Sequence, residues 1–100
     1  MGKDEVIEKI RKYKKLLEVH FDIDKVYLFG SYLKGNATED SDIDVAIIVN
    51  SLKGDYFSTV PLAWKIRSQI DNRIEPLILE KGNDDSGFLS EIINSGIEVS

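Results

Sequence analysis

The chain has 100 residues, of which 42% are hydrophobic, and a formal net charge of −5 at pH 7. This length suits one modest core, so we expect residues 1–100 to form a single domain with no second substrate-binding domain. The negative charge would repel a phosphate backbone, which argues against a polymerase and against direct nucleic-acid binding. Without cysteine, a long apolar run or a signal peptide, the chain is expected to be cytoplasmic, with no disulfide and no membrane span.

The N-terminal segment has the apolar periodicity of an amphipathic helix, with Asp4 as its expected cap. Apolar residues recur at intervals of three and four: Val6, Ile7, Ile10, Tyr13, Leu16, Leu17 and Phe21. The basic run at residues 11–15 is interpreted as a solvated face, because acidic residues surround it; a nucleic-acid patch is the alternative. His20 is the only histidine and has no cysteine nearby, so it does not predict a zinc site.

Two apolar strands, expected at residues 26–29 and 42–49, enclose a glycine turn, a short helix and a polar turn. Gly30 ends the first strand, and Ser31 follows as a natural helix N-cap. A glycine lets a phosphate approach the backbone, and the N–H groups and hydroxyl after it can donate to phosphate oxygens. Alone, a Gly-Ser pair after a strand predicts only a turn. Here the pair predicts a binding site for the terminal phosphates of a nucleotide, because two carboxylates follow at a fixed interval.

Those carboxylates are Asp42 and Asp44, and ten residues separate Ser31 from Asp42. Alternate residues of a strand share a face, so both aspartates project the same way, with Cα atoms roughly 7 Å apart. Two such carboxylates repel each other unless a cation lies between them. Mg²⁺ suits this position because it binds a few carboxylates and completes its octahedron with water and substrate phosphates.

Residues 50–55 are expected to form a loop, and Ser58 or Thr59 to cap a second helix with Pro61 in its first turn. This helix should extend to about residue 71. Trp64 is interpreted as a core residue, with a partner anchor as the alternative if it is exposed. Tyr56 and Phe57 precede the helix, where they either pack ordinarily or line the nucleotide pocket.

A third strand is expected at residues 73–79, with Glu75 as its acid. If this strand pairs beside residues 42–49, Glu75 can face the same metal and accept the proton of an attacking hydroxyl. The alternative is a solvent-facing glutamate on an edge strand, which the neighbouring Pro76 favours. Glu80 is expected on the surface.

The last elements are a polar loop at residues 81–87, a short helix from Phe88 that ends at Gly96, and a strand at 97–99. The fold class is therefore α/β or α+β, with a small mixed sheet and helices packed on one side. The strand order does not follow from the pattern.

The stretch at residues 30–48 resembles the motif of the DNA polymerase beta superfamily of nucleotidyltransferases, most closely its minimal MNT-type members. This resemblance implies a polymerase-beta-like fold and transfer of a nucleoside monophosphate from a triphosphate to a hydroxyl. It also implies that Asp42, Asp44 and Glu75 are catalytic and hold Mg²⁺, as two ions. Gly30 and Ser31 would hold phosphate, and Lys34 would contact it where many members carry arginine. The third acid is usually aspartate in this family.

The resemblance further implies a partner, because minimal MNT proteins often act as antitoxins of helical HEPN toxins. We expect a type VII-like pair, and thus a hetero-oligomer, in which AMP from ATP is transferred to a tyrosine of the HEPN protein. Two alternatives stay open: a non-catalytic module that sequesters this partner, and an enzyme acting on a small molecule such as an aminoglycoside.

Overall fold

The computed structural model describes residues 2–30, 32, 41–51, 56–82 and 87–100. In chain order, these residues form α1 (Lys3–Glu18), β1 (Ile23–Phe29), β2 (Ile43–Val49), α3 (Tyr56–Ile66), the 3-10 turn η1 (Arg67–Gln69), β3 (Ile74–Glu80), α4 (Phe88–Ser95) and β4 (Ile97–Glu98). The predicted helices and strands are thus confirmed within the described residues, each boundary lying within a few residues of its expected position. The short helix expected between Gly30 and Asp42 falls, except for residue 32, outside the described residues. None of the described helices is long and apolar enough to cross a membrane.

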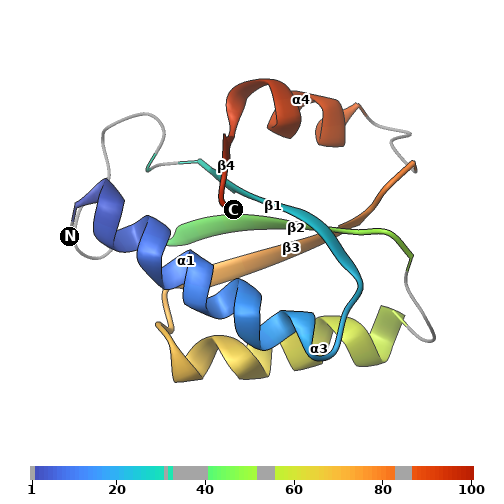
Figure 1. Cartoon of the computed structure of the whole chain (residues 1–100), viewed down its shortest axis with the longest axis horizontal. Helices are drawn as coiled ribbons and strands as arrows, with labels where there is room; N and C mark the ends of the chain where they lie inside the picture. Colours follow the sequence, from blue (N-terminus) through green and yellow to red (C-terminus); the bar gives the residue numbers. More distant parts are fainter. Residues whose placement is uncertain (1, 31, 33–40, 52–55, 83–86) are drawn as a thin grey trace.

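The four strands form one mixed sheet in the order β3-β2-β1-β4 (Figure 1). β1 pairs antiparallel with both β2 and β4, whereas β2 and β3 are parallel. The parallel pair is joined by a crossover through α3, as parallel strands require. The fold is that of a small α+β domain with a mixed sheet, as predicted.

Helices α1 and α3 cover one face of the sheet and α4 covers the other (Figure 1). The larger core lies under α1 and α3, where Ile43, Val45, Ile47 and Val49 of β2 are buried. A smaller cluster lies under α4 and includes Tyr27, Ala46, Ile48, Leu89 and Ile92. The expectation that the helices share one side therefore holds for α1 and α3 but not for α4.

Two predicted helix starts differ from the structure. α1 begins at Lys3 with Gly2 at the N-cap, so Asp4 lies in the first turn, where its charge suits the helix dipole. The prediction that Asp4 is the cap is wrong. α3 begins at Tyr56, which places Ser58 and Thr59 inside the helix and Pro61 in its interior instead of its first turn.

Trp64 is 37% exposed, and the prediction that it belongs to the core is wrong. Its neighbours on α3, Ala63 and Ile66, supply the buried face instead. The apolar stripe of α1 is confirmed, because Val6 and Ile10 are fully buried along with Tyr13 and Leu17. The hydroxyl of Tyr13 donates to the carbonyl oxygen of Ala63 at 2.6 Å, which joins α1 to α3.

Candidate active site

Gly30 ends β1 with a φ of +77°, a conformation that L side chains rarely adopt. A Cβ atom added at Gly30 would lie 2.9 Å from the Cγ atom of Asp44 and still closer to its Oδ2 atom. Glycine is therefore required at this position because the carboxyl group of Asp44 packs directly against the backbone. Ser31 and Lys34, the other predicted phosphate contacts, lie outside the described residues.

The strand register brings the predicted acids to one end of the sheet. Asp44 pairs with Phe29 of β1 on one side and with Glu75 of β3 on the other. Asp42 directly precedes β2 and lies two residues from Asp44, on the same face. Asp42 is exposed, whereas Asp44 and Glu75 are partly buried. All three acids thus face the side of the sheet that carries α4.

The alternative interpretation of Glu75, a solvent-facing residue on an edge strand, is correct about the edge strand but not about the exposure, because Glu75 is partly buried. β3 is indeed at the edge of the sheet. Its ladder to β2 includes hydrogen bonds from Ile43 N to Arg73 O and from Lys81 N to Val49 O, so odd-numbered residues direct their backbone groups to β2. Pro76 is even-numbered, and its nitrogen points away from β2, where no N–H is needed. Proline therefore marks the edge without excluding Glu75 from the site.

Burial raises the pKa of Glu75, and the charge of Asp42 raises it further, together with a hydrogen bond between the two side chains and the charge of Asp44. Arg67 acts in the opposite direction. A hydrogen bond between two carboxyl groups requires a proton on one of them. The three acids are therefore close enough that a proton or a cation must offset their mutual repulsion.

These donors fit Mg²⁺ in type, because carboxylate oxygens are the ligands that this ion binds. Within the described ranges, however, no three acidic, histidine or cysteine side chains meet as a ready-made metal cage. A Mg²⁺ ion bound by Asp42, Asp44 or Glu75 would take its remaining ligands from water and substrate phosphates, as is usual for this ion. The arrangement suits a metal that arrives with a nucleotide.

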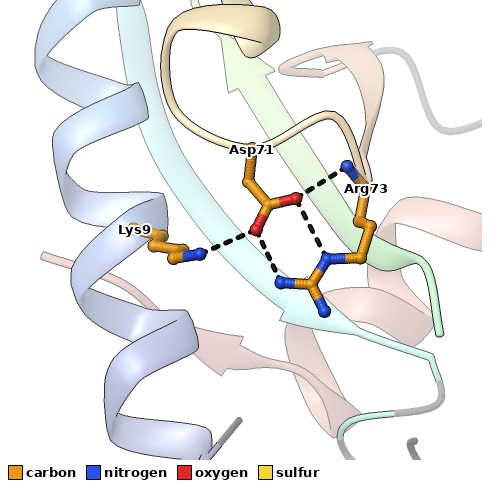
Figure 2. Close-up of polar contacts among 3 residues, drawn as sticks. All are labelled: Lys9, Asp71 and Arg73. Atoms are coloured by element: carbon orange, nitrogen blue, oxygen red, sulfur yellow. Dashed lines mark hydrogen bonds and ion pairs between the residues drawn. The ribbon is translucent and has the colours of Figure 1, made fainter. Parts of the chain in front are cut away.

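Asp71 lies in the connection between α3 and β3 and accepts hydrogen bonds from two basic residues, Lys9 and Arg73 (Figure 2). Lys9 of α1 donates to Oδ2 of Asp71 at 2.8 Å, and Arg73 donates from Nε to Oδ1 at 3.0 Å and from Nη2 to Oδ2 at 2.6 Å. The backbone N–H of Arg73 also donates to Oδ1, at 2.9 Å. This network ties α1 to the start of β3, two residues before Glu75.

Sequence reasoning missed both Arg67 and this Asp71 network. The Asp-Asn-Arg order at residues 71–73 carried a usable signal, since an aspartate often accepts a hydrogen bond from the backbone N–H two residues later. Nothing in the local pattern identified Arg67. The side chains of Tyr56 and Phe57, which were possible pocket residues, lie outside the described part of the structure.

The sheet with its carboxylate end and glycine turn defines a nucleotidyltransferase domain, and comparison with known proteins agrees. Residues 11–100 match the family described as polymerase beta, nucleotidyltransferase. The chain belongs to this family, and its predicted resemblance to it is confirmed.

Relatives of the chain are protein adenylyltransferases. A Methanocaldococcus jannaschii protein assigned as protein adenylyltransferase MJ0141 is 34% identical over 99 residues, which cover 95% of this chain and 99% of that protein. The protein adenylyltransferase MntA of Thermococcus cleftensis is 36% identical over 44 residues, or 44% of each chain. The chain is thus an enzyme of the nucleotidyltransferase class with adenylyltransferase relatives.

A solved structure of a toxin-antitoxin with AMP-PNP is also similar. It superposes with a TM-score of 0.67 at 25% sequence identity, over 94% of this chain and 72% of that one. The polymerase-beta-like fold predicted from the sequence is confirmed.

Proposed function

We propose that this chain is a Mg²⁺-dependent protein adenylyltransferase that transfers AMP from ATP to a hydroxyl of a partner protein. The single observation that carries the proposal is the pairing of Asp44 with Glu75, which aligns them with Asp42 on one face. The relative MJ0141, which matches nearly the whole chain, favours AMP and a protein acceptor. ATP as the donor is consistent with the AMP-PNP in the similar toxin-antitoxin structure.

In this mechanism the acceptor oxygen attacks the α-phosphorus of ATP. The bond from this phosphorus to the bridging oxygen breaks, and pyrophosphate leaves with the electron pair. Glu75 receives the proton of the hydroxyl, because it lies beside Asp44 and reaches the metal-binding end of the sheet. Mg²⁺, when bound, neutralises the phosphate charge and polarises the phosphorus centre.

Asp42 and Asp44 hold the metal in this proposal, and Gly30 with Ser31 and Lys34 holds the phosphates. The left-handed φ of Gly30 makes room for the carboxyl group of Asp44, and a glycine at this position lets a phosphate approach the backbone closely. Glu75 is the third ligand as well as the base.

We further propose that the acceptor is a tyrosine of a HEPN toxin, and that the chain is its antitoxin. The similar toxin-antitoxin structure supports a toxin as the partner, and the proposal of a HEPN protein comes from the resemblance of the sequence to minimal MNT proteins. In this proposal the partner supplies the surface that presents the hydroxyl. The alternatives from the sequence, a sequestering module and transfer to a small molecule, become outcomes of the test.

The test adds purified chain, Mg²⁺ and ATP labelled at the α-phosphate to a native lysate, followed by mass spectrometry of labelled products. Asp44→Asn is the inactive control, and Asp24→Asn removes a carboxylate from the opposite end of β1. We expect a labelled tyrosine in a helical partner with the parental chain and Asp24→Asn only. Label on a small molecule would instead support the alternative that the chain modifies a small molecule such as an aminoglycoside. A partner that binds without label would indicate a sequestering module.

A further inference from the structure

Arg67 begins η1, directly after α3, and is partly buried. Nη1 of Arg67 donates a hydrogen bond to the carbonyl oxygen of Ile74 at 2.9 Å. The guanidinium carbon also lies 4.4 Å from the centroid of the Trp64 ring, a cation-π contact. The side chain is therefore held at two points, on α3 and on β3.

The carbonyl group of Ile74 needs this contact because β3 is an edge strand. The carbonyl of Arg73 accepts from Ile43 of β2, so the next carbonyl along β3, that of Ile74, points away from the sheet. Arg67 supplies the hydrogen bond that a further strand would otherwise provide. The bond fixes the backbone at the residue that directly precedes Glu75.

Arg67 is also close enough to Glu75 for its charge to favour the ionised carboxylate. The other basic residues at this end of β3 are engaged elsewhere, because Lys9 and Arg73 both bind Asp71. Arg67 is thus the described cation that opposes the repulsion of Asp42 and Asp44 on Glu75. A planar guanidinium stacked on an indole suits this task better than a flexible ammonium.

We propose that Arg67, supported by Trp64, is a positioning residue for nucleotidyl transfer, which fixes the backbone at Ile74 so that Glu75 faces Asp42 and Asp44. The inference rests on the proposed function, because the value of a fixed Glu75 lies in that reaction. It also gives the exposed Trp64 a role, because its ring holds the guanidinium group of Arg67 through the cation-π contact. No part of this role requires Arg67 to touch substrate.

The test compares Arg67→Met, Arg67→Lys and Trp64→Leu with the control Lys65→Met, which removes an exposed cation from α3 beside Trp64. Measurements are kcat and the KM for ATP in AMP transfer, and thermal unfolding. We expect Arg67→Met to lower kcat about 10- to 100-fold, as loss of a supporting residue does, with KM for ATP changed less than about 2-fold. Arg67→Lys should recover part of kcat and Trp64→Leu should lose less, while Lys65→Met stays at the parental rate.

Two results would overturn the proposal. One is a loss of activity in Arg67→Met that matches its loss of folded protein, which would leave only a structural role. The other is a rise in KM for ATP with unchanged kcat, which would make Arg67 a nucleotide contact.

A second measurement separates this inference from the proposed function. Binding of Mn²⁺, as a substitute for Mg²⁺, is followed by electron paramagnetic resonance in the presence of an ATP analogue that cannot release pyrophosphate. A misplaced Glu75 should weaken Mn²⁺ binding in Arg67→Met about 10-fold, whereas Lys65→Met should bind normally. A parental chain that binds Mn²⁺ but transfers no AMP would contradict the proposed function alone. Equal Mn²⁺ affinity of Arg67→Met and the parental chain would contradict the role of Arg67.

Discussion

The two faces of the sheet differ in what their side chains do, although the same strands supply both. On the face under α1 and α3, Ile43, Val45 and Ile47 of β2 have no exposed surface. On the α4 face, the same strand presents Asp44 at its start and apolar residues only further on. Because successive residues of a strand point to opposite faces, a step of one residue separates packing from the site. Neighbours in the sequence should therefore respond to substitution in opposite ways.

The largest expected effect falls on the acidic face. Asp44→Asn and Asp42→Asn should lower AMP transfer by at least about 100-fold, since a metal contributes several kcal/mol to the transition state. The midpoint of thermal unfolding should stay the same or rise, because each change removes like-charge repulsion with Glu75. Transfer assays and calorimetry of both variants, with Asp24→Asn as control, test this. Parental rates in both variants would refute the metal assignment.

The opposite response is expected three residues further along β2, on the other face of the same strand. Ile47→Ala should destabilise the protein by about 2–4 kcal/mol, because Ile47 is fully buried in the larger core. Transfer per folded molecule should be unchanged, since Ile47 faces away from the acids. Urea unfolding measures the first quantity, and the rate corrected for folded fraction measures the second. An unchanged stability would show that this face is not packed as described.

A variant at Gly30 should lower both the stability of the protein and the rate of AMP transfer, because Gly30 contacts Asp44 and has a left-handed backbone conformation. Gly30→Ala places a methyl group against the carboxyl group of Asp44 and forces a left-handed φ on alanine. We expect a loss of about 1–2 kcal/mol in stability from backbone strain. Transfer should fall about 10-fold or more, because Asp44 must move. Gly82→Ala is the matched control, since Gly82 also has a positive φ and has open space around it. If the two variants lost equal activity, the Asp44 contact would be irrelevant.

The last prediction concerns the Asp71 network, which lies outside the acidic face and is expected to affect stability alone. The hydrogen bonds from Arg73 and Lys9 hold the pKa of Asp71 well below its usual range, although burial acts against them. A lowered pKa in the folded state adds stability above the unfolded pKa, and this stability is lost as the pH falls through the folded value. Asp71→Asn should therefore be about 1–3 kcal/mol less stable than the parental chain at pH 7.

The difference in stability between Asp71→Asn and the parental chain should shrink as the pH falls below about 4, where the aspartate of the unfolded chain becomes protonated. Urea unfolding at a series of pH values measures it. Asp4→Asn is a suitable control, because Asp4 lies in the first turn of α1 and outside this network. A stability gap that stays constant with pH would mean that the charge of Asp71 does not matter.

Most of the fold was predictable because it follows from local periodicity. The stripe of α1 and the apolar runs of β1, β2 and β3 each identify an element without knowledge of the others. The position of α4 was not predictable, because an amphipathic helix of eight residues packs equally well on either face of a sheet. Only the pairing of the strands determines which face is free.

The candidate site was predictable to the extent that its residues are close in the sequence. Gly30, Asp42 and Asp44 lie within one strand-turn-strand unit, and their spacing alone suggested a common site. Glu75 required the assumption that its strand pairs beside residues 42–49, which the structure confirms and shows to be a parallel pairing. Arg67 contacts a backbone carbonyl of β3 from η1, and a contact of this kind leaves no spacing rule in the sequence.

One experiment tests the central claim most directly: parallel reactions of the parental chain and its protein acceptor with ATP labelled at the α-phosphate and at the γ-phosphate. Nucleotidyl transfer puts the α label on the acceptor and releases the γ label as pyrophosphate. We predict α label on the acceptor with Mg²⁺ present, none with Asp44→Asn, and no γ label in either case. Transfer of the γ label, or equal α labelling by Asp44→Asn, would contradict the claim that this carboxylate face performs adenylyl transfer.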